Sequence, residues 1–259
     1  MPNLKVTIVQ ADLVWENRKA NIDRFERRLL ALKEQTHLVV LPEMFTTGFT
    51  MNAGPLAETM EGPTLKWMQA MARQLNADLA GSIIVREAGQ FFNRLLWASP
   101  DGGVRHYDKA HLFRMSGEHE VYRAGRRRLE VMCRNWRAAA FVCYDLRFPM
   151  WCRSLKPPYD LAVCVASWPS SRAAHWRTLL QARAIENQCY VVGVNRVGTD
   201  GNDQAYSGDS MVIDPEGRVL YQQGDREDVF TAVLPRLRLE QYRREFPAWM
   251  DADEQMPSA

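Results

Sequence analysis

The sequence predicts an α/β fold on three observations. Short apolar or alternating segments rich in Val, Ile and Leu recur along the whole chain and indicate strands. Longer segments between them repeat apolar residues at helical spacing. The 259 residues are 46% hydrophobic, enough to bury a large core, and no linker, internal repeat or low-complexity tract divides them. We therefore expect a single domain over residues 1–259, with helices packed outside the strands.

The first half of the chain alternates strands with two helices. Residues 4–10 (LKVTIVQ) alternate polar and apolar positions, and residues 37–41 (HLVVL) form an apolar run closed by Pro42. Residues 17–35 carry apolar side chains at helical spacing, and Gly62-Pro63 opens a second helix. We expect strands at 4–10, 37–41, 78–85, 91–98, 104–107 and 138–142, and helices at 17–35 and 64–75.

The second half repeats this alternation. An apolar run, a segment with helical spacing and another apolar run follow one another from residue 161 to residue 194. Asp214-Pro215-Glu216-Gly217 is typical of a turn and predicts a hairpin. We expect strands at 161–165, 190–194, 209–213, 218–221 and 229–233, and helices at 175–188 and 237–244.

Charge and composition argue against several classes of protein. The chain has 33 Lys+Arg against 31 Asp+Glu, and nucleic-acid binders usually carry a larger basic excess because they contact phosphates. No segment approaches the roughly 18 apolar residues of a membrane span, and the N-terminus lacks the apolar region of a signal peptide. The five cysteines, an odd number without a CxxC spacing, are expected to be free thiols in a reducing, cytoplasmic environment.

Cys143 is the strongest candidate nucleophile. It follows the small apolar segment AAAFV and precedes YDLRFP, a sequence typical of a tight turn into a helix. Such a turn exposes its first side chain and directs the following backbone N–H groups toward an anion, so we expect it to lower the pKa of the thiol. A neighbouring base is still needed at neutral pH. Considered alone, a free cysteine is more often an inert, buried thiol.

Glu43 and Lys109 are candidate partners for this thiol. Glu43 follows the predicted strand HLVVL, and open α/β sheets place their sites beyond the carboxyl ends of their strands. Lys109, within HYDKAHLF, is the only one of six lysines flanked by aromatic and apolar residues. A buried ammonium group can stabilise an oxyanion. Considered alone, either residue is also compatible with an ordinary surface charge.

Three segments taken together indicate a family. LPEMFTTGF, YDKAHLF and VCYDLRFP occur in this order, with spacings of 66 and 34 residues between Glu43, Lys109 and Cys143. They closely resemble the nitrilase (carbon-nitrogen hydrolase) superfamily, and the resemblance spans essentially the whole chain. It implies that these residues are a catalytic Glu-Lys-Cys triad. It also implies a four-layer α-β-β-α sandwich of the nitrilase type, a homodimer or higher homo-oligomer, and no metal or organic cofactor.

The same resemblance implies a second active-site glutamate. Members of the superfamily carry it on the loop after the lysine, typically seven residues before a glycine. That spacing selects Glu118 ahead of Gly125, with Glu120 as the alternative. Further segments that resemble the superfamily are LAGS at 79–82, the segment at 175–187, and GDS at 208–210.

Within the superfamily, PEMFTTGF, HLFRMSGEH, CYDLRFP and ASWPSSRAAHW look most like the bacterial omega-amidases. These enzymes remove the terminal amide of 2-oxoglutaramate and 2-oxosuccinamate. Because such a substrate also carries a carboxylate, its site should offer cationic groups. Arg147 and Arg172 are the candidates, and a structural salt bridge is the alternative for each. Trp168 and Phe45 are expected to form pocket walls, with packing in the core as the alternative.

The resemblance implies hydrolysis of a linear amide through a thioester. Glu43 would take the proton of Cys143, and Lys109 with the backbone N–H of Tyr144 would stabilise the oxyanion. Glu118 would orient Lys109. The expected partners are a small amide and water, with no nucleic acid and no membrane.

Three other interpretations stay open. Hydrolysis of N-carbamoyl amines or aliphatic amides is carried out on the same framework. A metallohydrolase would use His106, His111 and His119 with nearby Glu118 or Glu120. The histidine spacings of five and eight residues match no common zinc site. A catalytically silent binding protein would use residues 126–128, three arginines, to contact an anionic partner, although such runs are usually solvated.

Overall fold

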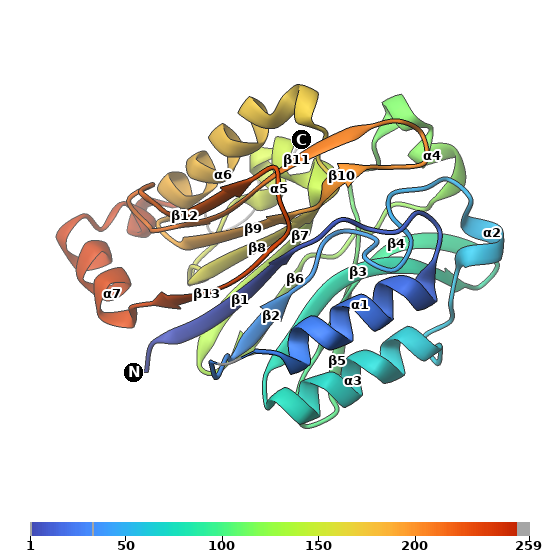
Figure 1. Cartoon of the computed structure of the whole chain (residues 1–259). Coiled ribbons are helices and arrows are strands. Elements are labelled where there is room, and N and C mark those ends of the chain that lie inside the picture. The colour runs from blue at the N-terminus through green and yellow to red at the C-terminus, as the bar shows by residue number, and fades with distance from the viewer. Residues whose placement is uncertain (1, 33, 253–259) are drawn as a thin grey trace.

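Two β-sheets stacked face to face form the centre of the structure, and helices cover their outer faces (Figure 1). The computed structural model describes residues 2–32 and 34–252. Helices α1 (Arg18–Leu30) and α3 (Pro63–Leu75) cover the first sheet, and α6 (Ala173–Asn187) covers the second. The order of layers is therefore that of the predicted α-β-β-α sandwich.

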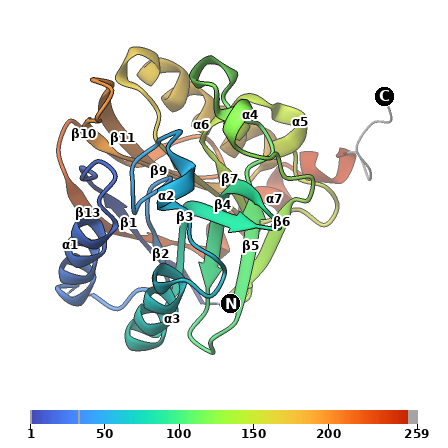
Figure 2. The same ribbon diagram turned by 90° about the vertical axis from the view of Figure 1, so that its right-hand side faces the viewer.

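The first sheet combines the N-terminal half of the chain with one C-terminal strand. Its order is β13-β1-β2-β3-β4-β5. The three strands β1, β2 and β3 are parallel, so each connection between them crosses over through a helix, and α1 and α3 lie side by side on one face (Figure 2). The strands are β1 (Leu4–Gln10), β2 (Leu38–Val40), β3 (Asp78–Glu87), β4 (Gln90–Ala98), β5 (Val104–Asp108) and β13 (Asp228–Leu234).

The second sheet has the order β10-β11-β9-β8-β7-β6, and β12 pairs with β11. Here β7, β8 and β9 are parallel, so their carboxyl ends meet at one edge. The strands are β6 (Leu129–Cys133), β7 (Trp136–Val142), β8 (Leu161–Ala166), β9 (Tyr190–Asn195), β10 (Val197–Thr199), β11 (Ala205–Ile213) and β12 (Val219–Gly224).

Short helices and one longer helix complete the described chain. They are α2 (Ala53–Leu56), α4 (Glu118–Val121), α5 (Pro149–Cys152), α7 (Arg236–Glu245) and the 3-10 helices η1 (Arg114–Ser116), η2 (Cys143–Arg147), η3 (Ser170–Arg172) and η4 (Ala248–Asp251). Among the helices of residues 2–32 and 34–252, none has the length and apolar composition needed to cross a bilayer.

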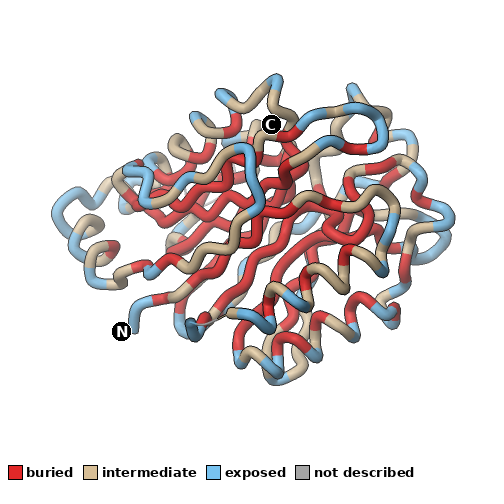
Figure 3. Tube along the Cα trace, in the orientation of Figure 1, coloured by how far each residue is buried: buried red, intermediate tan, exposed pale blue. Residues whose placement is uncertain are grey.

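Apolar side chains of the two sheets meet in a continuous core. Val6 and Leu95 of the first sheet and Val163 of the second belong to one buried cluster, which extends to Trp176 of α6. A second cluster joins α1 and α3 to the other face of the first sheet. Figure 3 shows the strands buried between helices whose outer sides are exposed. Burial on both faces explains why β2, β8 and β9 are nearly continuous apolar runs.

The predicted strands and longer helices are all present, with boundaries that differ by a few residues. The predicted helix 17–35 ends earlier, at Leu30, where the N–H of Ala31 bonds back to the carbonyl of Arg27. Strands β6 and β10 were missed. Both are short and lie at the edges of the second sheet, where pairing with one neighbour is sufficient and no strong apolar run is required.

We predict that Gly193→Ala lowers the free energy of unfolding by about 1–3 kcal/mol, because a methyl group here overpacks a filled contact between layers. Gly193 lies in β9 beneath α6, and a Cβ atom would be 2.5 Å from Leu180 Cδ1 and 2.9 Å from Trp176 Cζ2. Chemical denaturation measures the change. Gly54→Ala is the control, since a Cβ there has no atom within 4 Å. Equal stability of the two variants would contradict this packing.

Candidate active site

Glu43 lies at the end of the segment that follows β2, and its side chain is completely buried. Ser82 accepts two hydrogen bonds that hold the turn carrying Glu43. Its hydroxyl accepts from Met44 N at 2.8 Å, and its carbonyl accepts from Phe45 N at 3.0 Å. Gly81 permits this close approach, since a Cβ there would lie 2.9 Å from Phe45 Cδ1. The LAGS segment therefore fixes the direction of the Glu43 carboxylate.

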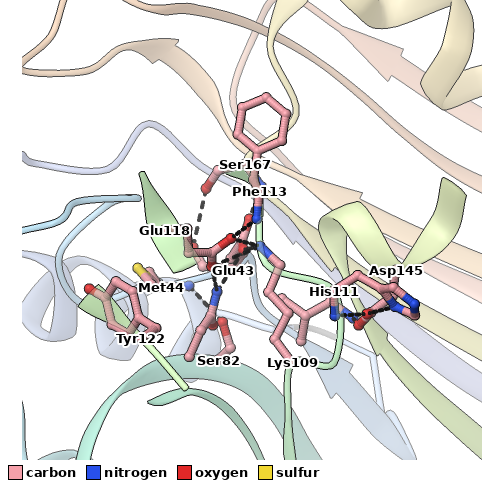
Figure 4. A network of polar contacts seen from close by, with 12 residues as sticks. Glu43, Met44, Ser82, Lys109, His111, Phe113, Glu118, Tyr122, Asp145 and Ser167 are labelled. Atoms are coloured by element: carbon pink, nitrogen blue, oxygen red, sulfur yellow. Dashed lines mark hydrogen bonds and ion pairs between the residues drawn. The ribbon is translucent and has the colours of Figure 1, made fainter. Parts of the chain in front are cut away.

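Lys109 directly follows β5 and lies between two carboxylates (Figure 4). Its Nζ donates to Glu43 Oε1 at 2.9 Å and to both oxygens of Glu118 at 3.0 and 2.9 Å. All three side chains are fully buried. Glu118, rather than Glu120, therefore contacts the lysine; the Glu120 side chain is 76% exposed.

Other donors complete the hydrogen bonding of the two carboxylates. The Asn93 side-chain amide donates to Glu43 Oε1 at 2.8 Å and to Glu118 Oε1 at 3.2 Å. Ser167 N donates to Glu43 Oε2 at 2.8 Å, and Phe113 N donates to Glu118 Oε2 at 2.5 Å. Every carboxylate oxygen of the cluster thus has a donor, as buried charges require.

The two glutamates determine the charge of the lysine. Burial alone would lower the pKa of Lys109, but the negative charges of Glu118 and Glu43 outweigh it and raise the pKa well above its ordinary value. Lys109 is therefore protonated throughout the neutral pH range. Burial raises the pKa of Glu118, although the lysine charge opposes this effect. One cation is shared by two carboxyl groups that compete for it.

Gly125 explains the spacing between the second glutamate and the glycine that follows it. Gly125 N donates to the carbonyl oxygen of Lys109 at 2.9 Å. A Cβ on this residue would lie 2.0 Å from the Asp108 carbonyl oxygen. The loop that carries Glu118 can thus return against the Lys109 backbone only with a glycine at this point.

Cys143 begins the 3-10 helix η2, immediately after β7. Its φ of 46° lies in the left-handed region, which is unusual for a residue other than glycine. Arg183 of α6 stabilises this turn, because its guanidinium donates to the Leu146 carbonyl oxygen at 2.7 Å. A strained residue held by its surroundings is a common feature of functional sites.

The thiol of Cys143 is neutral in the resting site. Burial and the negative charge of Glu43 raise its pKa well above the usual value, and the charge of Lys109 offsets only part of this effect. The expectation that the turn lowers the thiol pKa was therefore wrong. The 3-10 helix η2 has five residues, so its small dipole does little to lower the thiol pKa. Burial has the larger effect, since only 9% of the cysteine surface is exposed.

Cys143 and Lys109 line a cavity of about 390 Å³. Apart from Tyr206 of β11, its lining residues lie in loops and 3-10 helices that follow strands of the two sheets. The lining residues are Phe49, Met51, Lys109, Phe113, Met115, Ser116, Cys143, Tyr144, Arg147, Ser167, Trp168, Pro169, Arg172, Asp200, Asn202, Gln204 and Tyr206. The cavity is large enough for a small organic substrate.

Two arginines in this wall are held by aromatic rings. The Arg147 guanidinium lies 4.8 Å from the centre of the Trp168 ring and donates to His175 Nδ1 at 3.1 Å. The Arg172 guanidinium lies 5.4 Å from the centre of the Phe113 ring. Among the described residues, neither guanidinium has a carboxylate oxygen within 4.0 Å. The salt bridges considered as alternatives are therefore not formed there.

The histidines considered for a metal site do not converge. His111 Nδ1 contacts Asp145 Oδ1, and His119 Nε2 lies 3.9 Å from Glu120 Oε1. Over residues 2–32 and 34–252, no group of three His, Cys, Asp or Glu side chains is arranged to hold a metal ion.

A family model described as carbon-nitrogen hydrolase matches residues 5–244, which include all three triad segments. The chain belongs to the carbon-nitrogen hydrolase family. Its fold, the nitrilase-type sandwich, and its class of reaction, hydrolysis of carbon–nitrogen bonds in amides, follow from this membership and from the relatives below.

Relatives and a solved structure agree with this assignment. The carbon-nitrogen hydrolase is 48% identical to Omega-amidase YafV of Escherichia coli K12, over 98% of each chain, and 31% identical to 2-oxoglutaramate amidase of Bacillus subtilis, over 95% and 96% of the two chains. The crystal structure of XC1258 from Xanthomonas campestris, a CN-hydrolase superfamily protein with an arsenic adduct in its active site, is 44% identical, with a TM-score of 0.97 over 100% of both chains.

One predicted wall of the hydrolase pocket was wrong. Phe45 does not line the cavity; it is fully buried and packs edge to face on Phe25 at 5.5 Å between ring centres. Its backbone continues the turn after Glu43, which directs the ring into the core beneath α1. The other predicted residues, Tyr144, Arg147, Trp168 and Arg172, do lie in the lining.

Asn93 and Ser167 were not recognised from the sequence. Asn93 had a detectable signal, because it is a neutral polar residue within the apolar segment FFNRLLW of a predicted strand. Ser167 contributes its backbone N–H to Glu43, and any residue except proline offers that group. No side-chain pattern could have identified it.

We predict that Asn93→Leu lowers the free energy of unfolding by about 2–4 kcal/mol, because it removes a donor from two buried carboxylates. Denaturant titration measures the loss. Asn202→Leu is the control, since Asn202 is exposed at the mouth of the same cavity and is expected to change stability little. An Asn93→Leu variant as stable as the parent would contradict the role of this amide.

Proposed function

We propose that this hydrolase is an omega-amidase that removes the terminal amide of 2-oxoglutaramate or 2-oxosuccinamate, releasing ammonia and the 2-oxo acid. The observation that carries the proposal is the pair of guanidinium groups without carboxylate partners, Arg147 and Arg172, in the cavity that holds Cys143. The substrate carboxylate would pair with them while its amide reaches the thiol. The names of the relatives, omega-amidase and 2-oxoglutaramate amidase, support this substrate.

The first step is attack by the thiol. Because the Cys143 thiol is neutral at rest, a base must take its proton as Sγ attacks the amide carbon. Glu43 is the base in this proposal. Its carboxylate is held in place by hydrogen bonds from Ser167 N and Lys109 Nζ.

The second step is stabilisation of the tetrahedral oxyanion. Lys109 Nζ, protonated across the neutral range, and the backbone N–H of Tyr144 are its donors in this proposal. The loss of one such donor typically costs about 2.7–4 kcal/mol of transition-state stabilisation. Glu118 is a positioning residue here, since it holds Nζ through two oxygens.

The remaining steps return the site to its starting state. The carbon–nitrogen bond breaks, the nitrogen takes the proton from Glu43, and ammonia leaves a thioester on Cys143. Water then enters, Glu43 removes its proton, and the resulting hydroxide attacks the thioester carbon. When the carbon–sulfur bond breaks, the sulfur recovers the proton from Glu43 and the acid is released.

Two further parts of the proposal come from the family resemblance. They are assembly into a homodimer or higher homo-oligomer and a cytoplasmic location. Hydrolysis of N-carbamoyl amines or aliphatic amides is the alternative activity. A substrate of this kind without a carboxylate would leave the two arginines of the cavity without a role.

We predict that Cys143→Ala abolishes ammonia release from 2-oxoglutaramate, because no thioester can form. A coupled ammonia assay measures the rate. Cys189→Ala is the matched control: it also removes a fully buried thiol, but Cys189 precedes β9 at the opposite end of the sheet. A Cys143→Ala variant with the activity of the control would contradict the mechanism.

We predict that Arg172→Gln and Arg147→Gln each raise KM for 2-oxoglutaramate roughly 10- to 100-fold, the equivalent of one charge-assisted hydrogen bond. Steady-state kinetics on 2-oxoglutaramate and on the neutral amide propionamide measure the difference. Arg126→Gln, at an exposed loop position, is the control. An equal rise in KM for propionamide would contradict carboxylate recognition. A preference of the parent enzyme for an N-carbamoyl amino acid, which also carries a carboxylate, would contradict the omega-amidase activity.

A further inference from the structure

Asp145 is a buried carboxylate to which the proposed mechanism gives no role. It lies in η2, two residues after Cys143, and has no exposed surface. Oδ2 accepts from the Tyr107 hydroxyl at 2.7 Å and from Val142 N at 3.0 Å. Oδ1 accepts from the backbone N and the ring Nδ1 of His111, both at 2.9 Å (Figure 4). A carboxylate only accepts, so Nδ1 of this histidine carries the hydrogen.

These partners lie next to the two groups that would hold the oxyanion. Tyr107 and His111 flank Lys109 by two residues on either side, and Val142 directly precedes Cys143. The Lys109 segment follows β5, the last strand of the first sheet, whereas Cys143 follows β7 in the second sheet. Among the described strands, β5 pairs only with β4, so no β-ladder fixes the lysine segment relative to the cysteine turn. Asp145 spans this gap with hydrogen bonds.

The donors to Asp145 are themselves held in place. The Tyr107 hydroxyl accepts from Trp151 Nε1 at 2.9 Å and from Ala110 N at 3.1 Å, so its one hydrogen is left for Asp145. Burial and the nearby Asp145 charge raise the pKa of Tyr107 well above its ordinary value, and the hydroxyl stays a donor. The His111 ring stacks on Phe148, with 3.7 Å between ring centres. Both donors to Asp145 therefore have further contacts that hold them in place.

We propose that Asp145 is a positioning residue for amide hydrolysis: its carboxylate fixes the Lys109 segment against the Cys143 turn, so that Lys109 Nζ and the Tyr144 N–H address the same oxyanion. This inference rests on the proposed function. A displacement of about 1 Å at a reacting group can cost on the order of 10²-fold in rate. Arg147 and Arg172, which would bind the substrate carboxylate, make none of the bonds to Asp145.

The test is Asp145→Asn, which keeps the shape of the side chain but turns one acceptor into a donor. Either Tyr107 and Val142, or His111, then lose their acceptor. We expect kcat for 2-oxoglutaramate to fall about 10²-fold, with KM changed less than about threefold. The concentration of folded sites is measured by titrating Cys143 with an alkylating reagent and subtracting the signal from denatured protein. Dividing the measured rate by this concentration gives kcat per folded site.

Asp160→Asn is the matched control for a purely structural effect. Asp160 is also a buried carboxylate with several donors, from Arg137 N, Arg236 and Arg243. It precedes β8, at the opposite end of the second sheet from Cys143. We expect this variant to lose stability while kcat per folded site is unchanged.

Tyr107→Phe is the second variant, and it tests the same connection if Asp145→Asn does not fold. It removes one of the four bonds to Asp145 and also the acceptor of Trp151 Nε1 and Ala110 N. We expect kcat to fall at least about threefold with KM unchanged. In the double variant, the fold-loss in kcat should be smaller than the product of the two single losses, because both changes break the same bond between Tyr107 and Asp145. A kcat within threefold of the parent in Asp145→Asn, or an unchanged kcat in Tyr107→Phe, overturns the inference. The dependence on Cys143, measured separately, reports on the proposed function itself.

Discussion

The ammonium group of Lys109, buried between Glu43 and Glu118, is the interaction on which the rest of the site depends. Three charged groups without solvent are costly unless every one is paired, and the removal of one partner from a buried ion pair typically costs about 3–5 kcal/mol. The partners come from segments that are distant in sequence: the turn after β2, the strand β4, the turn after β5 and the short helix α4. The cluster forms only when both the first sheet and its loops are in their final arrangement.

The second sheet contacts Glu43 through Ser167. Ser167 N, directly after β8, donates to Glu43 Oε2, and the neighbouring strand β7 ends at Cys143. Because β7 and β8 are parallel, their carboxyl ends lie at the same edge, and the thiol is brought to the carboxylate by ordinary ladder geometry. Asp145 then connects the cysteine turn to the lysine segment, so the two sheets are joined at the site by polar contacts as well as by their apolar core.

Much of this arrangement could be predicted from the sequence, and the remainder has identifiable physical reasons. The strands β2, β8 and β9 were recognised because both of their faces are buried. Glu43, Lys109 and Cys143 were recognised because three motifs occur together. Strand order was not accessible, because pairing partners depend on contacts between distant segments. Phe45 was misassigned because the left-handed Met44, at φ of 43°, changes the direction of the chain just before it. The raised pKa of Cys143 could not be foreseen either, because it depends on burial and on the charge of Glu43 rather than on the local turn.

The raised thiol pKa also explains why a lysine shared by two carboxylates suits the proposed chemistry. While Glu43 is ionised, its charge disfavours a thiolate, so Cys143 stays protonated until a substrate is attacked. Transfer of the proton to Glu43 removes the charge that opposed the thiolate and, at the same moment, removes one of the two partners of Lys109. Nζ keeps its bonds to Glu118 and has a donor free for the new oxyanion. The negative charge thus moves from Glu43 to the substrate oxygen around one fixed cation, and the net charge of the buried cluster never changes. The buried cluster can support the reaction because its donors are already aligned with the charge that develops.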